Sequence, residues 1–505
     1  MLTSDHGRPN VLLISTDHWP ASLLGVAGHP SIQTPTLDQM AHNGIRFTNA
    51  YTECPICIPA RRTLMTGTTP RTHGDRTFMT DALMPDLPTV AQTFRDAGYQ
   101  AQAVGKLHVF PQRDRIGFDD VILAEEGRPQ LGTIDDHEMF LADEGYAGQA
   151  FTHGMTNNDY VNRPWHLPEY THVTNWTTQQ MARQIKRRDP RRPAFWFLSY
   201  CHPHPPLAPL QCYLDMYRDV DPEPRNIGPW SFEPSLMPYL LQRVNAEWDR
   251  YSDHEMRQIK RAFYALCTHI DHQIRVILGT LREEEELDNT IIMFTSDHGD
   301  MLGDHGLWAK RLFYENAANI PMILMGTAGD ERVGHHRVDN RLVGWQDVMP
   351  TLLDLAGLEI PDTVDGISMI GAQTREYIYG ECAEGPTATR MIHDGRHKLI
   401  YYPTGNHVQL FDTAADPEES MNLADDPQHA DLRQQLTGWL LDELYGTDEA
   451  WVQNGALIGL PDLEYTPGPS RGFGGQRGLH WPPPPLDLSG RVVGAPWTEG
   501  QSVDQ

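Results

Sequence analysis

The stretch NTIIMFTSDHGD, residues 289–300, joins a nearly continuous apolar run to a cluster of aspartate and histidine side chains. Strands of this near-continuous apolar character are typical of a parallel sheet that is covered on both faces. Similar runs recur at 10–16, 100–106, 194–201 and 321–326, and they alternate with helix-like segments at 35–44, 89–99, 177–188 and 252–283. This alternation predicts an α/β fold, with a large mainly parallel sheet that helices cover on both faces.

Past residue 372 the pattern changes to short alternating runs. These runs are REYIYGEC, TRMIHDG, HKLIYYP and VQLFD, and a helix-like segment follows near 430–445. They predict a small C-terminal antiparallel sheet with a packed helix. After Gly446 the chain is rich in proline and glycine, which favours an extended tail. We therefore expect a catalytic α/β domain at 1–371, a small α+β subdomain at 372–445, and a tail at 446–505 that lies on the body or on a neighbouring subunit of a homo-oligomer.

Composition restricts the partners of the chain. A net charge of −28 argues against nucleic acid and against an anionic membrane as partners. The N-terminal apolar run from Val11 to Ile14 is too short for a signal peptide or a membrane helix, and six cysteines in 505 residues do not form a disulfide framework. We expect a cytoplasmic protein in which any site for an anion is a local positive island.

Polar clusters follow four of the predicted strands. They are Asp17-His18, Lys106 with His108, the segment CHPHPP at 201–206, and Asp297-His298-Gly299-Asp300. In open α/β sheets, functional groups gather at the carboxyl ends of the strands. Taken alone, each cluster has a simpler explanation, since a carboxylate often caps a helix, a lysine often lies on the surface, and His204 could merely order a proline-rich loop. Four clusters built from the same residue types favour one shared site.

Three of these side chains suit a metal ion. Asp17, Asp297 and His298 offer carboxylate oxygens and a neutral imidazole, which are common donors to a divalent cation. Asp304 and His305 in GDHG look similar in sequence, but we place them in the loop beyond the metal.

Three strongly basic side chains suit an anion with several oxygens. They are Lys106, Lys310 and Arg61. His108 and His204 have unperturbed pKa values near neutrality and are suited to moving protons. A metal ion and three cations at one place indicate that the substrate is a small anionic ester of sulfate or phosphate.

The segment ECPICIPARRTLMTG, residues 53–67, holds two cysteines whose roles have to be separated. Cys54 and Cys57 could form a redox pair, half of a zinc site, or one structural thiol beside one reactive thiol. A second CxxC is absent from the sequence, and thioredoxin-like motifs lie early in a small βαβ domain. Pro59 fits the first turn of a helix, which places Cys57 at a helix N-terminus where a negative group is favoured. We therefore prefer the interpretation of one structural thiol beside one reactive thiol, with Cys57 as the reactive one.

The frame Cys57-Ile58-Pro59-Ala60-Arg61, with Thr66-Gly67 downstream, resembles the C-x-P-x-R signature of the formylglycine-dependent sulfatases, which belong to the alkaline phosphatase superfamily. Further motifs of that family follow in the same order along the chain. They are GKLH at 105–108, PHPP at 203–206, SDHGDMLGDHGLWAK at 296–310 and LFDTAADPEESMNLA at 410–424. The resemblance covers nearly the whole chain to about residue 445.

This resemblance implies a role for each matching residue. Cys57 would be oxidised to formylglycine by a maturation enzyme, and Arg61 would support the hydrated form. The other implied assignments are Asp17, Asp297, His298 and the modified residue 57 for the metal, Lys106, His204 and Lys310 for the ester oxygens, and His108 for the formylglycine diol. One diol hydroxyl would attack sulfur and release the alcohol, and the other would then expel sulfate.

Two departures from the family pattern bear on the metal and on the substrate. His18 follows Asp17 where many sulfatases have a second aspartate, and His298 stands where asparagine is common. More imidazole and fewer carboxylates weaken the case for Ca²⁺ and make Mn²⁺ an alternative. Related phosphonate monoester and phosphodiester hydrolases share the Asp-His segment, so the chain is placed close to that branch.

The predicted function is therefore hydrolysis of a small alkyl or aryl sulfate ester. The alternative is a phosphonate monoester or phosphodiester hydrolase on the same scaffold, and Lys106 and His108 favour the sulfatase. A non-catalytic anion-binding protein remains open if Cys57 is never modified.

Overall fold

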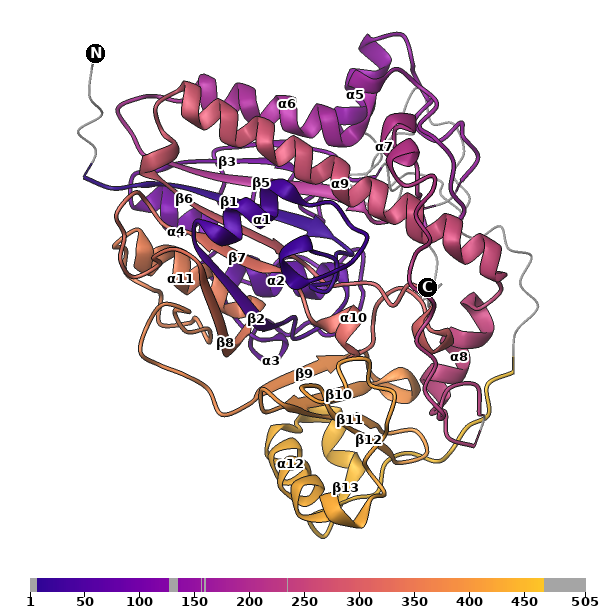
Figure 1. Ribbon diagram of the computed structural model, residues 1–505. Coiled ribbons are helices and arrows are strands. Elements are labelled where there is room, and N and C mark those ends of the chain that lie inside the picture. The colour runs from indigo at the N-terminus through magenta and orange to yellow at the C-terminus, as the bar shows by residue number, and fades with distance from the viewer. Residues whose placement is uncertain (1–6, 127–134, 156, 159, 234, 467–505) are drawn as a thin grey trace.

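The computed structural model describes residues 7–126, 135–155, 157–158, 160–233 and 235–466. A large sheet occupies the centre of the body (Figure 1). Its strands are β1 (Asn10–Asp17), β2 (Ile45–Tyr51), β3 (Gln100–Gly105), β4 (Asp120–Leu123), β5 (Ala194–Pro203), β6 (Thr290–Ser296), β7 (Met322–Met325) and β8 (Arg337–Gly344). Their order is β4-β3-β5-β1-β6-β7-β2-β8, and only β7 pairs antiparallel with its neighbours among these described strands. The predicted large, mainly parallel sheet is confirmed.

Helices pack on both faces of this sheet. The helices described in this part of the chain are α1 (Pro35–His42), α2 (Cys57–Thr66), α3 (Pro70–His73), α4 (Val90–Asp96), α5 (Asp136–Asp143), α6 (Val173–Lys186), α7 (Gln211–Met216), α8 (Tyr239–Trp248), α9 (Asp253–Glu283), α10 (Glu315–Ala318) and α11 (Val348–Leu355). Successive residues of a strand point to opposite faces, so Val11 and Leu13 of β1 join a core with α2, α4 and α11, whereas Leu12 and Ile14 join another with α1, α6 and α9. The predicted coverage of both faces is confirmed.

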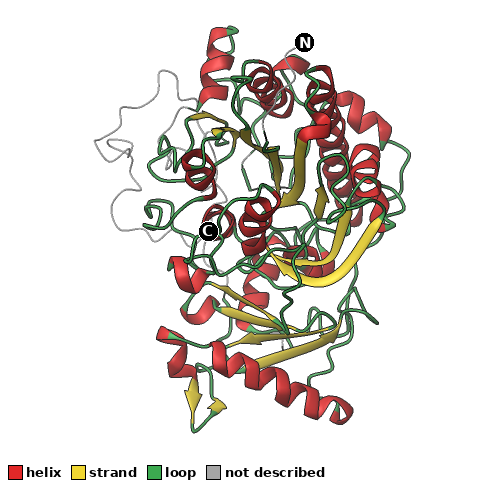
Figure 2. Cartoon of the chain, turned by 90° about the vertical axis from the view of Figure 1, so that its left-hand side faces the viewer, coloured by secondary structure: helices red, strands yellow, loops and turns green. Residues whose placement is uncertain are grey.

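A small antiparallel sheet packs below the body (Figures 1 and 2). It contains β9 (Ile378–Cys382), β10 (Thr389–His393), β11 (His397–Tyr402) and β12 (His407–Asp412), in the order β12-β11-β10-β9, and α12 (Ala430–Glu443) covers one face. The opposite face, with Met391, Ile400 and Phe411, shares a core with Phe313 and Tyr314 of the body. The predicted antiparallel sheet and its helix are confirmed.

Buried ion pairs join the small sheet to the body. Arg76 lies 2.8 Å from an Asp448 oxygen that also accepts from Arg390 at 2.8 Å. Lys398 of β11 contacts Glu315, the first residue of α10, and lies 2.9 Å from Glu419. Breaking such a buried pair costs several kcal/mol, on the order of 3–5, so these contacts fix the sheet against the body.

The start of the predicted tail is structured. Residues Gly446–Trp451 form a 3₁₀ helix, and β13 (Val452–Gln453) pairs with β14 (Ala456–Leu457). Most of the proline- and glycine-rich segment, residues 467–505, lies outside the described residues, so the extended tail, its place in an oligomer and the three-part division remain predictions. Within the described residues, no helix is long and apolar enough to cross a bilayer.

Candidate active site

The predicted site residues lie at one edge of the large sheet. Asp17 ends β1, Lys106 follows β3, His204 follows β5, and Asp297 follows β6. Strand β1 lies between β5 and β6, with Ser15 opposite Ser199 and Thr16 opposite Ser296. The parallel registers therefore bring the four carboxyl ends together, as expected for this class of sheet.

Helix α2 carries the signature cysteine to this edge. Cys57 is its first residue, and Ile56, with an extended backbone, precedes it as the N-cap. The Cys57 thiol is buried, 3.3 Å from Nε2 of His298 and 3.7 Å from Oδ1 of Asp17. Burial and the Asp17 carboxylate raise the pKa of the thiol, but the positive groups Lys310, Lys106 and His298 outweigh them, so the pKa is lowered.

Arg61 lies one helical turn beyond Cys57, and its guanidinium is fixed from several sides. Its Nε donates to Oδ2 of Asp297 at 3.2 Å, and its Nη1 donates to the Lys106 carbonyl at 2.8 Å and to Oγ of Ser199 at 2.9 Å. Although burial disfavours the charged form, the carboxylates of Asp297 and Asp17 raise the pKa of Arg61. The guanidinium thus couples α2 to the ends of three strands.

Four side chains form a metal-type donor group. The donor atoms of Asp17, Cys57, Asp297 and His298 all lie within 4.8 Å of one another and are buried. Nδ1 of His298 donates to the Gly299 carbonyl at 2.9 Å, so in the neutral ring that a metal ion requires, the lone pair is on Nε2, which faces Cys57. Here the cysteine sulfur stands in for the oxygen that a formylglycine would place there. Two carboxylates, one imidazole and such an oxygen fit a divalent cation.

The two acidic members of this group differ in charge environment. Burial raises the pKa of Asp17, but the positive charge of the Lys106 ammonium outweighs that effect and holds the pKa well below its usual range. Burial and the neighbouring Asp17 carboxylate raise the pKa of Asp297. A divalent cation would relieve the repulsion between the two carboxylates, which further supports the fit.

Lys106 is held by two carboxylates. Its ammonium contacts Oδ2 of Asp17 and lies 2.9 Å from Oε1 of Glu126. The neighbouring Glu125 accepts from the backbone N–H groups of Leu107 at 2.8 Å and His108 at 2.9 Å. Two glutamates from the loop after β4 therefore hold the segment that bears Lys106.

His108 is buried, and its ring lies against Phe78 with a centroid separation of 5.9 Å. The contacts described for His108 run to Glu125 and Phe78. Its predicted contact with the modified residue 57 accordingly stays a prediction.

Lys310 lies between two imidazoles. Its Nζ is 3.1 Å from Nε2 of His204 and also contacts Nε2 of His18. Burial and the Lys310 charge keep the pKa of the His18 imidazole well below its usual range, so the neutral ring accepts from the lysine. Nδ1 of His18 lies 2.7 Å from Oδ2 of Asp300, which also accepts from the Tyr160 hydroxyl.

Asp304 and His305 lie outside the donor group, as predicted. Oδ1 of Asp304 accepts from the backbone N–H of Asn226 at 3.1 Å, and Nδ1 of His305 accepts from that of Gly228 at 3.1 Å. They hold a neighbouring loop.

Several residues of the site were not singled out from the sequence. They are Ser199, Glu125, Glu126 and Tyr160, and the contacts of His18 with Lys310 and with Asp300 were not foreseen. His18 and Asp300 were visible next to predicted ligands, whereas no spacing in the sequence signals the other four.

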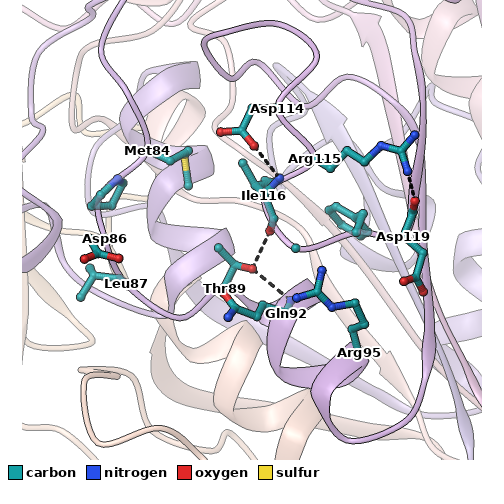
Figure 3. Close-up of a pocket in the computed structure, with 13 residues that line it drawn as sticks. Met84, Asp86, Leu87, Thr89, Gln92, Arg95, Asp114, Arg115, Ile116 and Asp119 are labelled. Atoms are coloured by element: carbon teal, nitrogen blue, oxygen red, sulfur yellow. Dashed lines mark hydrogen bonds between the residues drawn. The ribbon is translucent and has the colours of Figure 1, made fainter.

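A separate hollow of about 640 Å³ opens on the surface near α4 (Figure 3). None of its thirteen lining residues belongs to the site described above. Its walls mix Arg95 and Arg115 with Asp86, Asp114 and Asp119, and Thr89 donates to the Ile116 carbonyl at 2.6 Å. Two arginines and three aspartates partly neutralise one another, which leaves the hollow with charges of both signs.

A family model described as Sulfatase matches residues 9–358, which makes the chain a sulfuric ester hydrolase. The chain belongs to the sulfatase family, as the motifs predicted. A second model, described as N-sulphoglucosamine sulphohydrolase, C-terminal, matches residues 303–444. Membership of this family shows the enzyme class.

Individual relatives support the same class. An arylsulfatase of Clostridium perfringens is 34% identical over 470 residues, covering 89% of this chain and 97% of the relative. A choline-sulfatase of Rhizobium meliloti is 30% identical over 439 residues, covering 84% and 83%. The phosphonate monoester hydrolase of Agrobacterium radiobacter has a similar fold, with a TM-score of 0.75 at 24% identity over 86% of this chain and 95% of that one.

Proposed function

We propose that this chain hydrolyses a small alkyl or aryl sulfate ester by means of a formylglycine at position 57 and one divalent cation, Ca²⁺ or Mn²⁺. The observation that carries the proposal is the placement of the Cys57 sulfur inside the donor group formed with Asp17, Asp297 and His298. A cation bound there would supply Lewis-acid stabilisation of negative charge, and the formylglycine would supply a hydroxyl nucleophile.

The side chains around this centre bind the sulfuryl oxygens. Lys106 and Lys310 reach this centre from different elements. Lys106 follows β3, and Lys310 lies in the loop after β6. Their donors are fixed before the substrate arrives, because Lys106 contacts Asp17 and Lys310 contacts His18 and His204. Preorganised donors of this kind stabilise charge that develops in the transition state without reorganisation.

A proton is also available for the departing oxygen. Nζ of Lys310 lies 3.1 Å from Nε2 of His204, within hydrogen-bonding distance. We assign to Lys310 and His204 the donation of a proton to the leaving alcohol. Arg61, on the same helix as residue 57, holds the Asp297 carboxylate in place.

Three further elements belong to the proposal: a maturation enzyme that modifies Cys57, a cytoplasmic location, and a homo-oligomer formed through the C-terminal tail. The alternative of a phosphonate monoester or phosphodiester hydrolase is supported by His298 in the second metal segment, and it makes a different prediction in the assay below.

The modification is tested by intact mass, because conversion of a cysteine to formylglycine lowers the mass by about 18 Da. Fragment masses should place the loss on residue 57. Turnover of nitrophenyl sulfate by the modified protein supports the proposal. An unmodified Cys57 in a protein with full sulfatase turnover would exclude the formylglycine, and a modified protein that prefers phenylphosphonate esters would support the alternative.

A further inference from the structure

We infer that Glu126 is a specificity-determining residue that makes the site favour singly charged esters over doubly charged ones. This inference rests on the proposed function, since it concerns the anion that Lys106 and His204 bind. Glu126 follows β4 and is drawn into the site although no motif of the sequence marks it.

Contacts place the Glu126 carboxylate beside the anion-binding groups. Its Oε1 lies 2.9 Å from Nζ of Lys106 and 3.6 Å from Nδ1 of His204. All three side chains are almost fully buried, with exposed fractions of 6%, 0% and 1% respectively. Charges so poorly screened by water act on one another strongly.

The backbone of Glu126 supports a functional placement. Its φ is +57°, in the left-handed region that side chains rarely adopt. Nδ2 of Asn157 donates to the Glu126 carbonyl at 3.3 Å and helps to hold this conformation. Strained residues of this kind, which cost on the order of 1–3 kcal/mol, concentrate at functional sites.

The carboxylate changes the charge that the site can accept. The Lys106 ammonium already contacts the Asp17 carboxylate, so Glu126 adds a second negative charge at the same cation. A sulfate monoester and a phosphodiester each carry one negative charge, whereas a phosphate monoester carries close to two at pH 8, because its second pKa is about 6. Repulsion from Glu126 therefore disfavours the phosphate monoester most. The same repulsion weakens the hold on inorganic sulfate, which is a dianion, and so eases release of the product.

The test compares three nitrophenyl esters at pH 8: the sulfate, the phosphate monoester and the methyl phosphodiester. In Glu126→Gln, kcat/KM for the phosphate monoester should rise relative to the sulfate by roughly tenfold, the scale of one added charge contact at an intermediate dielectric. The ratio of the diester to the sulfate should stay within about twofold, since both carry one charge. Inorganic sulfate should inhibit the variant roughly tenfold more strongly.

Two control variants separate charge from shape. Glu126→Asp keeps the charge and should keep the wild-type preference, whereas Glu331→Gln removes an exposed carboxylate and should change no ratio. Equal loss of all three activities in Glu126→Gln, with unchanged sulfate inhibition, would show that Glu126 only positions Lys106 and would overturn the inference. If the wild type preferred the diester or phenylphosphonate to the sulfate, the sulfatase proposal would fail, but the shift in the phosphate ratio would still decide the role of Glu126.

Discussion

Nε2 of His298 lies 3.3 Å from the sulfur of Cys57, although 241 residues separate them in the chain. The imidazole is held by the bond from its Nδ1 to the Gly299 carbonyl, and the cysteine is held at the first position of α2. An oxygen that replaced the sulfur at position 57 would therefore lie beside His298 and Asp17. This fixed relationship underlies the first two predictions.

Substitution of the two cysteines should have different effects. Cys57→Ala and Cys57→Ser should abolish sulfatase turnover, because alanine has no group that can be oxidised to an aldehyde and the C-x-P-x-R frame marks a cysteine, not a serine, for modification. Cys54→Ala should keep most of the turnover, since the Cys54 sulfur lies in the core shared with the small sheet, 3.8 Å from the Arg76 carbonyl. Measured kcat/KM on nitrophenyl sulfate decides the matter. Equal loss from both positions would instead support a CxxC pair.

Asp297→Asn should lose bound metal and activity together. The change removes one of the two carboxylates of the donor group and one partner of Arg61. Elemental analysis of the purified protein measures the metal. Asp304→Asn is the matched control, because Asp304 stands in a similar sequence but bonds Asn226 instead; it should retain the metal. If the protein were purified under metal-replete conditions and proved fully active with no divalent ion bound, the metal site would be ruled out.

Lys106→Ala should lower kcat/KM for aryl sulfate by on the order of 10²-fold, the scale of removing one preorganised transition-state donor. The exposed Lys186→Ala serves as the control and should change little, because surface pairs such as Lys186–Glu283 contribute weakly. In the wild type, aryl sulfate should also be hydrolysed more efficiently than phenylphosphonate monoester. The opposite order of efficiencies would favour the alternative function of a phosphonate monoester or phosphodiester hydrolase. It would not contradict the fold or the assignment of residue 57 as the nucleophile.

Glu53→Gln should stabilise the protein at alkaline pH. Burial and the nearby Asp347 raise the pKa of Glu53 to about 8, against 4.5 for an unperturbed glutamate. Above pH 4.5 the unfolded chain releases a proton that the folded state retains, so this residue lowers stability as pH rises towards 8. Glutamine cannot ionise and avoids the loss.

The advantage of Glu53→Gln should be small near pH 4.5 and should reach on the order of 4 kcal/mol near pH 8. Denaturant unfolding across this range measures it. The exposed Glu331→Gln should follow the wild type at every pH. A difference between Glu53→Gln and wild type that did not vary with pH would contradict the raised pKa.

The sequence predicted those strands whose two faces are both buried. Residues of β1 and β6 are buried at every position, and this produces the continuous apolar runs from which the sheet was inferred. Strand β8 was not predicted, because its first half is largely exposed and its residues RVDNRLVG mix charged and apolar types. Strand β4 was also not predicted, because it has only four residues. The reversed direction of β7 could not be read from PMILMG, since an apolar run carries no information about direction.

The site was predictable to the extent that its residues adjoin strands. Asp17 and Asp297 directly end or follow buried strands, so the common edge of the sheet brings them together. Ser199 points at Arg61 from within β5, and Glu126 reaches Lys106 from a loop. Such contacts depend on the exact course of loops and on strand register, which spacing in a single sequence does not reveal.

The burial of Cys57 sets an order of events during synthesis. Only 1% of the cysteine side chain is exposed in the folded protein. Strand β1 acquires its partners late, because the contacts Ser15–Ser199 and Asn10–Glu286 span 184 and 276 residues, and such non-local pairings form slowly. If Cys57 is modified as we propose, the modifying enzyme has to reach the thiol between the emergence of α2 and the closing of the sheet. Molecules that fold before Cys57 is modified would keep the unmodified cysteine. The fraction of active enzyme in a preparation should therefore depend on the rate of modification relative to the rate of folding.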